Sequence, residues 1–317
     1  MDTLARVGTV VFDKTGTLTR GEFEVTSVHP DDFDETELLH LAAHVEHFST
    51  HPIGEALRTA FPNEATHGCK ITDVEEIAGH GIRANVSGCT VCVGNSKMMD
   101  AIGVKWNNCH SIGTIIHVAV DGKYVGHVVI NDRLKDDSAQ AVKSLKRLGV
   151  DHMVMLTGDR KEVAFDVAKK LGLDTCYAEL MPADKVRYVE QLLATKTENK
   201  TLAFVGDGIN DAPVLKRADI GIAMGGLGSD AAIEAADVVL MTDEPSRVVD
   251  AIKISKKTMT IVKQNIIFAI SIKLIVLILS AIGISNMWQA VFADVGVSIL
   301  AILNALRALY LSLIHIS

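Results

Sequence analysis

The chain has 317 residues, enough for two or three domains, and 48% of them are hydrophobic, which is ample for folded cores. Its formal net charge of −8 argues against a nucleic-acid partner. Five cysteines in a chain of this length do not make a disulfide framework, so a reducing compartment fits better.

The first predicted element is a buried strand over the apolar residues 7–12, and it leads into the heptad DKTGTLT at residues 13–19. Open α/β sheets bind ligands at the carboxyl ends of their strands, which is where Asp13 stands. A carboxylate there can attack a phosphoryl group, and the following Thr-Gly-Thr offers N–H groups and hydroxyls to phosphate oxygens. The first element therefore predicts a phosphoryl-transfer loop with Asp13 as its nucleophile.

The next segment, residues 21–123, interrupts the strand–helix rhythm of the chain and predicts a separate α+β domain inserted after the first strand. Because both of its ends return to the same sheet, it could move as a lid on a two-strand hinge. Its predicted helices cover 35–45 and 53–61, and its predicted strands lie near 71–77, 82–86, 90–93 and 115–120.

Histidines are concentrated on the first of these helices. His40, His44 and His47 share roughly one helical face, and His51 lies beyond the helix end. A metal-sensing site and a set of surface histidines both remain open, and the sequence favours surface histidines.

From residue 124 to 255 strands and helices alternate, which predicts a doubly wound parallel sheet. Three polar motifs lie at strand ends or helix starts of this part: TGD at 157–159, PADK at 182–185 and GDGIND at 206–211. All can meet Asp13 at one sheet edge. Carboxylates there suit Mg²⁺, and Lys185 and Thr157 can offset charge on a transferring group. The predicted catalytic residues are Asp13, Lys14, Thr15, Thr157, Gly158, Asp159, Lys185 and Asn210, and the predicted Mg²⁺ site comprises Asp13, Thr15, Asp207 and Asp211.

The last fifty residues contain two apolar stretches, 266–284 and 287–306, each long enough to cross a hydrocarbon core. The short break at Ser285-Asn286 predicts a transmembrane hairpin over 262–310, with both ends cytoplasmic because lysine and arginine flank the spans. A pair of buried core helices is the alternative. Lys273 and Asp294 are costly inside a bilayer, and their levels differ by about 6 Å, which a Lys side chain can span, so a pair is one interpretation. A snorkelling lysine and an aspartate satisfied by another helix are the alternative.

Together, the heptad and the three later motifs resemble P-type ATPases, which are ion pumps with a haloacid dehalogenase-like fold and an aspartyl-phosphate intermediate. The resemblance implies a phosphorylation domain at 1–20 and 124–255. Soluble phosphatases of this fold usually carry a second Asp two residues after the nucleophile, where this chain has Thr15. Because Thr cannot serve as a general base, the phospho-aspartate should persist, which favours a pump.

Residues 21–123 also contain His51-Pro52 with Glu46 five residues before it, the glycine loop Gly79-His80-Gly81, and Gly94-Asn95 at a strand end. Together these motifs resemble the nucleotide-binding domain of heavy-metal-transporting P-type ATPases, the P1B group. The resemblance implies that ATP is held by Glu46, His51, Gly79, Gly81, Gly94 and Asn95. A Lys in the penultimate helix and an Asp-X-Gly in the last helix resemble the Zn²⁺/Cd²⁺/Pb²⁺ branch, which implies that Lys273 and Asp294 line the path of the transported ion.

This resemblance covers residues 1 to about 310, the C-terminal half of such a pump in the cell membrane, with the phosphorylation and nucleotide-binding domains in the cytoplasm. It implies partners outside this sequence, namely an actuator domain and six upstream membrane helices. Residues 311–317 match the translation of a sequencing-library adapter and are predicted to be an artefact. A haloacid dehalogenase-like phosphatase and a non-transporting, nucleotide-binding regulatory fragment are the alternative functions.

Overall fold

The computed structural model describes residues 1–47, 52–61, 68–107, 112–207, 211–225, 234–284 and 286–314, with the side chains of residues 52, 290 and 309–314 left out. The chain forms two compact units. The first consists of Met1–Thr17, Asp136–Gly158 and Leu171–Ser317, and the second of Leu18–Lys135 and Asp159–Lys170. His51, Asn210 and residues 315–317, which carried predictions, lie outside the described residues.

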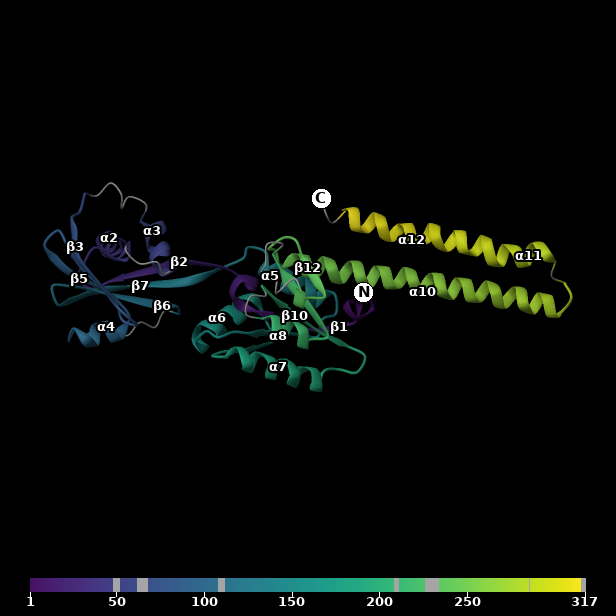
Figure 1. The fold of residues 1–317 in the computed structure, drawn as a ribbon, viewed down its shortest axis with the longest axis horizontal. Coiled ribbons are helices and arrows are strands. Elements are labelled where there is room, and N and C mark those ends of the chain that lie inside the picture. Colours follow the sequence, from purple (N-terminus) through teal and green to yellow (C-terminus); the bar gives the residue numbers. More distant parts are fainter. Residues whose placement is uncertain are drawn as a thin grey trace. The chain divides into compact units, whose positions relative to one another are not determined.

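The first unit is built on a six-stranded parallel sheet with strand order β12-β11-β10-β1-β8-β9 (Figure 1). Every residue of β1 is buried, which explains why it is apolar without alternation. The chain leaves β1 toward β8 on one side and later adds β10 on the other, so the topological switch point lies between β1 and β10. The strands are β1 (Val7–Asp13), β8 (His152–Leu156), β9 (Thr175–Tyr177), β10 (Thr201–Gly206), β11 (Ile220–Met224) and β12 (Val238–Leu240).

Helices cover this sheet and bury its apolar side chains, which confirms the predicted doubly wound fold. Val11, Val154 and Phe204 of three neighbouring strands form one core with Val189 and Leu215 of the covering helices. The helices of this unit are α1 (Asp2–Ala5), α5 (Ser138–Arg147), α7 (Pro182–Thr195) and α8 (Ala212–Arg217), whereas α6 (Lys161–Leu171) falls in the second unit as far as Lys170.

The second unit contains an antiparallel sheet of order β2-β7-β6-β5-β4-β3. Helices α2 and α3 pack on one face of this sheet and α4 on the other (Figure 1). The elements are β2 (Thr19–Pro30), α2 (Glu35–Glu46), α3 (Pro52–Ala60), β3 (Ile71–Ile77), β4 (Gly81–Val86), β5 (Cys89–Gly94), α4 (Ser96–Ala101), β6 (Thr114–Val120) and β7 (Lys123–Leu134).

The inserted α+β domain is present, but its predicted limits of 21 and 123 are wrong. Strand β7 pairs with both β2 and β6, so it belongs to the antiparallel sheet and not to the parallel one. The boundary between the two compact units accordingly falls between Lys135 and Asp136. The apolar run of β7 is typical of a strand in either sheet, and the sequence pattern alone does not distinguish them.

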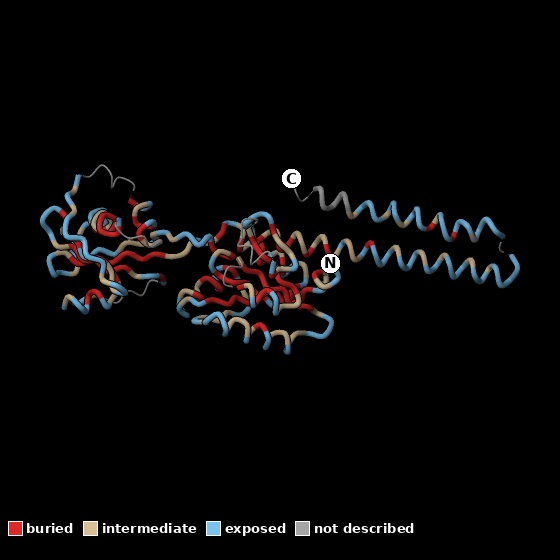
Figure 2. Tube along the Cα trace, viewed as in Figure 1, coloured by how far each residue is buried: buried red, intermediate tan, exposed pale blue. Residues whose placement is uncertain are grey.

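The C-terminal hairpin consists of α10 (Ser246–Ala281), α11 (Met287–Val291), a π-helical turn η3 (Phe292–Gly296) and α12 (Val297–Ile314). Two stretches, Ser246–Ala281 and Met287–Ala308, are long and apolar enough to cross a membrane, by length and composition. Of their most apolar windows only 6% and 12% are buried, and Figure 2 shows exposed residues along both helices. The alternative of two buried core helices is therefore wrong.

Candidate functional site

The site of the first unit lies where three neighbouring strands end. Asp13 is the last residue of β1 and pairs in register with Leu156, the last residue of β8, so Thr157 follows directly beside it. On the other side of β1, Asp207 follows the end of β10. The structure thus brings the ends of the predicted motifs to one edge of the sheet, at its topological switch point.

A lysine from helix α7 completes this edge. Lys185 lies in the first turn of α7, and its Nζ donates hydrogen bonds to Asp13 Oδ1 at 2.6 Å and to Asp211 Oδ1 at 2.9 Å. The side chains of all three residues are nearly buried, with exposed fractions of 13% for Lys185, 10% for Asp13 and 2% for Asp211. One ammonium group therefore bridges two carboxylates in a site with little water, which makes each interaction stronger than on the surface.

The charges of this cluster do not balance. Burial, with the nearby carboxylates of Asp211 and Asp207, raises the pKa of Asp13 to about 7, although Lys185 opposes the shift. Burial disfavours the charged form of Lys185, but Asp13 and Asp211 outweigh it and raise the pKa of this lysine. The site thus has carboxylate charge in excess of its bridging ammonium group. Mg²⁺ prefers carboxylate and other hard oxygen ligands, and a bound cation would offset the excess negative charge, so these residues fit that ion.

The loop after Asp13 approaches Asp207 closely. Gly16 has φ of 73°, and a Cβ added to it would lie 2.6 Å from Asp207 Oδ2. Glycine is therefore required here both by conformation and by space. Thr17 is fully buried, and no hydrogen-bond partner for its Oγ1 is found among the described residues. Thr17 carries the second hydroxyl of the Thr-Gly-Thr run that the sequence predicts to face phosphate oxygens, although it is not among the predicted catalytic residues.

The other predicted catalytic residues fall in different surroundings. Lys14 and Thr157 are buried, and Thr157 is held between strand ends by a backbone hydrogen bond to Tyr177. Thr15, two residues after Asp13, has an extended backbone conformation. A Cβ added to Gly158 would lie 3.2 Å from the carbonyl oxygen of Leu180. Asp159 belongs to the second unit. The catalytic roles of all these residues stay predictions.

Four of the predicted nucleotide-binding residues meet in the second unit. Gly81 of β4 pairs with Gly94 of β5. A Cβ added to Gly81 would lie 2.1 Å from the Val93 carbonyl oxygen, and a Cβ added to Gly94 would lie 2.2 Å from the His80 carbonyl oxygen. Asn95 caps helix α4, and its Nδ2 donates to the Gly79 oxygen at 2.9 Å. The glycines let two chain segments lie closer than any side chain would permit.

Glu46 is the last residue of α2 and is 6% exposed, and its carbonyl oxygen accepts a hydrogen bond from Arg58. Helix α2 packs through Leu38 and its neighbours against the sheet face of β4 and β5. Glu46 thus lies in the helix layer that packs on the sheet carrying the glycine pair. Its contact with a nucleotide stays a prediction.

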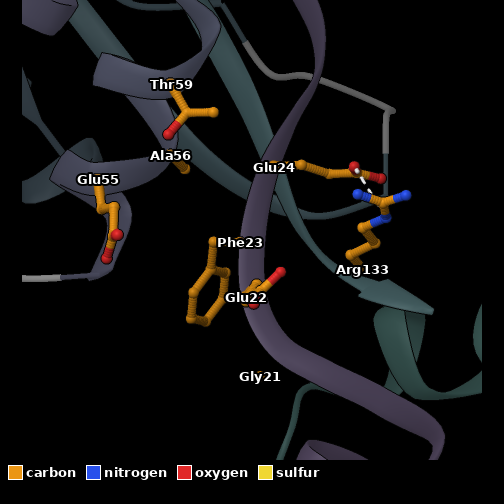
Figure 3. Close-up of a pocket in the computed structure, with 8 residues that line it drawn as sticks. All are labelled: Gly21, Glu22, Phe23, Glu24, Glu55, Ala56, Thr59 and Arg133. Carbon is orange, nitrogen blue, oxygen red and sulfur yellow. Dashed lines mark ion pairs between the residues drawn. The ribbon is translucent and has the colours of Figure 1, made fainter. Parts of the chain in front are cut away.

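A pocket of about 390 Å³ lies elsewhere in the second unit, between the start of β2 and helix α3 (Figure 3). Three glutamates line it, against one arginine, Arg133, which pairs with Glu24 at 3.9 Å. An acidic lining repels polyphosphate, and none of the predicted nucleotide-binding residues lines this pocket. The full lining is Gly21, Glu22, Phe23, Glu24, Glu55, Ala56, Thr59 and Arg133.

The hairpin brings the two predicted membrane residues together. Lys273 Nζ of α10 lies 3.1 Å from Asp294 Oδ1 of η3. Asp294 is inside a π-helical turn, where Gly296 leaves room for the Phe292 ring, 2.6 Å from where a Cβ would stand. Such turns often occur at functional sites, and this one was not predicted from the sequence. Asn265 also links the helices, donating to the Ala301 oxygen and accepting from Asn304.

Comparison with known proteins gives consistent matches over most of the chain. The haloacid dehalogenase-like hydrolase family matches residues 7–219. A zinc-transporting ATPase of Synechocystis is 54% identical over 97% of this chain and 42% of its own length. A cadmium, zinc and cobalt-transporting ATPase of Bacillus subtilis is 52% identical over 98% of this chain and 44% of its own length. The chain therefore spans less than half of the length of these relatives.

A solved structure of similar fold is the crystal structure of a zinc-transporting PIB-type ATPase in the E2.Pi state. It is 36% identical to this chain, with a TM-score of 0.84, and the match covers 97% of this chain and 51% of that one.

Proposed function

The chain belongs to the haloacid dehalogenase-like hydrolases, and from that membership we propose that it is the catalytic part of an ATP-driven pump for divalent heavy-metal cations. The observation that carries the proposal is the buried bridge from Lys185 to Asp13 and Asp211 at the switch point of the sheet. It presents one carboxylate as a nucleophile and keeps a cation beside the place where charge develops.

In the proposed reaction an oxygen of Asp13 attacks the γ-phosphorus of ATP. The new O–P bond forms as the bond from the γ-phosphorus to the bridging oxygen breaks, and ADP leaves with that oxygen and its electron pair. Lys185 and the Thr157 hydroxyl offset charge on the phosphoryl oxygens. Mg²⁺, which Asp13, Asp207 and Asp211 would hold, supplies further charge neutralisation when bound.

Thr15 governs the fate of the phosphorylated aspartate. It stands two residues after Asp13, with a hydroxyl that is too weakly basic to activate water at neutral pH. Without a base at this position the acyl phosphate outlasts the chemical step, as a pump requires in order to change shape before hydrolysis. We assign that later hydrolysis to an actuator domain outside this chain.

We further propose that the second unit binds ATP through Glu46, His51 and the glycine cluster around Gly81 and Gly94. Glycines at a close approach leave the backbone accessible to a flat ligand. Because ATP is supplied by the cytoplasm, this unit and the parallel-sheet unit would face that compartment.

The Lys273–Asp294 pair supports an ion path through the cell membrane. A carboxylate suits a borderline divalent ion such as Zn²⁺, Cd²⁺ or Pb²⁺ better than soft Cu⁺, and a lysine can replace the ion as counter-charge when it leaves. Two helices cannot enclose a path, so the proposal requires further membrane helices of the same pump. The relatives named for zinc and cadmium transport support this ion class.

The test of the catalytic proposal is labelling with ATP that carries a labelled γ-phosphate and Mg²⁺. We expect an acid-stable, hydroxylamine-labile label on the protein that Asp13→Asn abolishes. Rapid release of phosphate without a label would instead identify a phosphatase.

The transport proposal needs the full-length pump in vesicles. Asp294→Ala should abolish Zn²⁺-stimulated ATP hydrolysis and Zn²⁺ uptake. Persistence of both activities would refute the ion path. If this chain is labelled on Asp13 but its full-length parent takes up no metal, a nucleotide-binding regulatory role replaces transport.

A further inference from the structure

Three metal-ligating side chains meet in the second unit, whereas both proposed sites of ion chemistry belong to the first. His40 and His44 stand one turn apart on α2, and Cys69 approaches them from the segment before β3. One ligand atom of each residue lies within 4.8 Å of the others. His40 Nε2 and Cys69 Sγ are 3.8 Å apart.

These distances suit a tetrahedral ion. Zn²⁺ binds imidazole nitrogen at about 2.0–2.1 Å and thiolate at about 2.3 Å, which places N and S ligands about 3.5 Å apart across a tetrahedron. The His40–Cys69 separation is already within a few tenths of an ångström of that value. Histidines at i and i+4 on one helix can hold the same ion, as they do in helical zinc motifs.

The surroundings hold the ligands in place without closing them off. His44 is 5% exposed, whereas His40 and Cys69 are half-buried, so the cluster lies at the edge of the core with access from solvent. The Phe61 ring lies 5.0 Å from the His40 ring, and the His44 ring lies edge-on to the His40 ring at 4.3 Å. This packing restricts the rotamers of the ligands before any ion arrives.

We propose that His40, His44 and Cys69 form a binding site for one Zn²⁺ or Cd²⁺ ion. Two imidazoles and one thiolate are borderline-to-soft donors, which select these ions over Mg²⁺. Binding releases the Cys69 thiol proton to solvent and leaves a fourth coordination position for water. The site contains none of the residues proposed to hold ATP, Mg²⁺ or the ion in the membrane.

This site differs from the surface histidines that the sequence favoured. The sequence placed His47 and His51 in the same group, but the structure provides a different third ligand, Cys69, which lies 25 residues after His44. Because the folded structure brings these distant segments together, the three ligands are close to one another before an ion binds.

The experiment uses the full chain in detergent with Asp294→Ala as background, so that the proposed ion path contributes no binding. Titration with Cd²⁺ is followed by the ultraviolet thiolate-to-cadmium charge-transfer band, and equilibrium dialysis counts bound Zn²⁺. We expect one ion of this kind per chain, not displaced by excess Mg²⁺. Cys69→Ser should remove the band, and His40→Gln should weaken Cd²⁺ binding by at least about 10-fold, since even groups outside the ligand set contribute that much.

The matched control is Cys89→Ser, which removes an exposed thiol of the same unit. It should leave the band and the affinity unchanged. A band that survives Cys69→Ser, or one that Cys89→Ser removes, overturns the assignment. Circular dichroism of each variant checks folding, and unchanged Cd²⁺ affinity in a folded His40→Gln variant equally overturns it.

Discussion

At the scale of single residues, the proposed phosphorylation site has more carboxylate groups than bridging ammonium groups. Lys185 is shared between Asp13 and Asp211, and Asp207 lies close enough to add to the negative potential. Without Lys185, the nearly buried carboxylates of Asp13 and Asp211 would lose the ammonium group that bridges them. The same residue therefore maintains the folded site and offsets charge on the phosphoryl group in the proposed reaction.

We expect Lys185→Met to lower the rate of phosphoenzyme formation by about 100-fold or more, because removal of one charge-stabilising donor typically costs that much. Quenched-flow labelling with ATP measures the rate. Arg187→Gln is the matched control, since Arg187 is on the same helix but its side chain is 63% exposed. Equal losses in both variants would assign the effect to helix α7 in general.

Gly16→Ala should nearly abolish labelling and weaken Mg²⁺ dependence, because the added methyl group would collide with the Asp207 carboxylate. Gly21→Ala is the matched control, because it adds the same backbone strain without the collision. Gly21 has φ of 70°, close to the 73° of Gly16, but nothing lies within 4 Å of its added Cβ. Both variants should therefore share a strain of about 1–2 kcal/mol, measured by denaturant unfolding, and only Gly16→Ala should lose the label.

At the scale of elements, the sequence was most informative where strands end. Asp13, Asp207 and Lys185 could be predicted to converge because buried parallel strands deliver their carboxyl ends to one edge. The sheet of β7 could not be predicted, since its apolar run fits either unit. The π-helical turn at Asp294 has no distinctive local pattern. The contact of Cys69 with the histidines of α2 depends on tertiary structure, so local sequence patterns do not predict it.

A row of histidines crosses three strands of the antiparallel sheet. His29 pairs in register with His127, and His127 with His117. Tyr124 Oη lies 2.9 Å from His117 Nδ1 and 3.0 Å from His127 Nδ1. Burial, with the neighbouring His127, lowers the pKa of His117 to about 4, and burial with His29 lowers the pKa of His127.

This row predicts acid sensitivity of the second unit. The unfolded chain binds a proton at His117 below about pH 6.5, whereas the folded unit resists protonation until about pH 4. The contribution of neutral His117 to the free energy of unfolding is therefore fully present above pH 6.5. It is lost as the pH falls from 6.5 to about 4, which lowers the free energy of unfolding by about 3 kcal/mol. Denaturant unfolding of the unit at pH 7 and pH 4.5 measures the loss.

His117→Gln should remove most of this pH dependence, although it also perturbs the packing at neutral pH. His152→Gln, at an exposed histidine of the first unit, should leave the dependence unchanged. An equally steep acid transition in the His117 variant would place the titrating group elsewhere.

At the scale of the whole molecule, one chain carries two sheets with buried cores and a hairpin whose apolar side chains are exposed. Ile267, Ile270, Leu277 and Ile302 are each more than 60% exposed, and the other exposed large apolar side chains of α10 and α12 range from 40% to 56%. Contiguous exposed apolar surface of this kind is typical of a contact with a membrane or with another protein segment, which supports the proposed hairpin.

We expect the chain expressed in cells to stay with the membrane pellet after extraction at alkaline pH, because both helices are long enough to span. A chain ending at Ile261, which keeps the buried part of α10, should be released to the supernatant. Release of the complete chain under the same conditions would contradict insertion of the hairpin.

Helix α10 has no break between its two ends. Near its start the Ser246 N–H donates to Asp137 of the parallel-sheet unit, and Val248 and Ile252 are buried there. Lys273 lies about 40 Å further along the axis at 1.5 Å per residue. If this continuous helix tilted as a rigid body by roughly one-tenth of a radian about its start, the position of Lys273 would move by about 4 Å. An angular change too small to disturb a hydrogen bond at Asp137 would thus be magnified into a displacement longer than the Lys273–Asp294 ion pair itself.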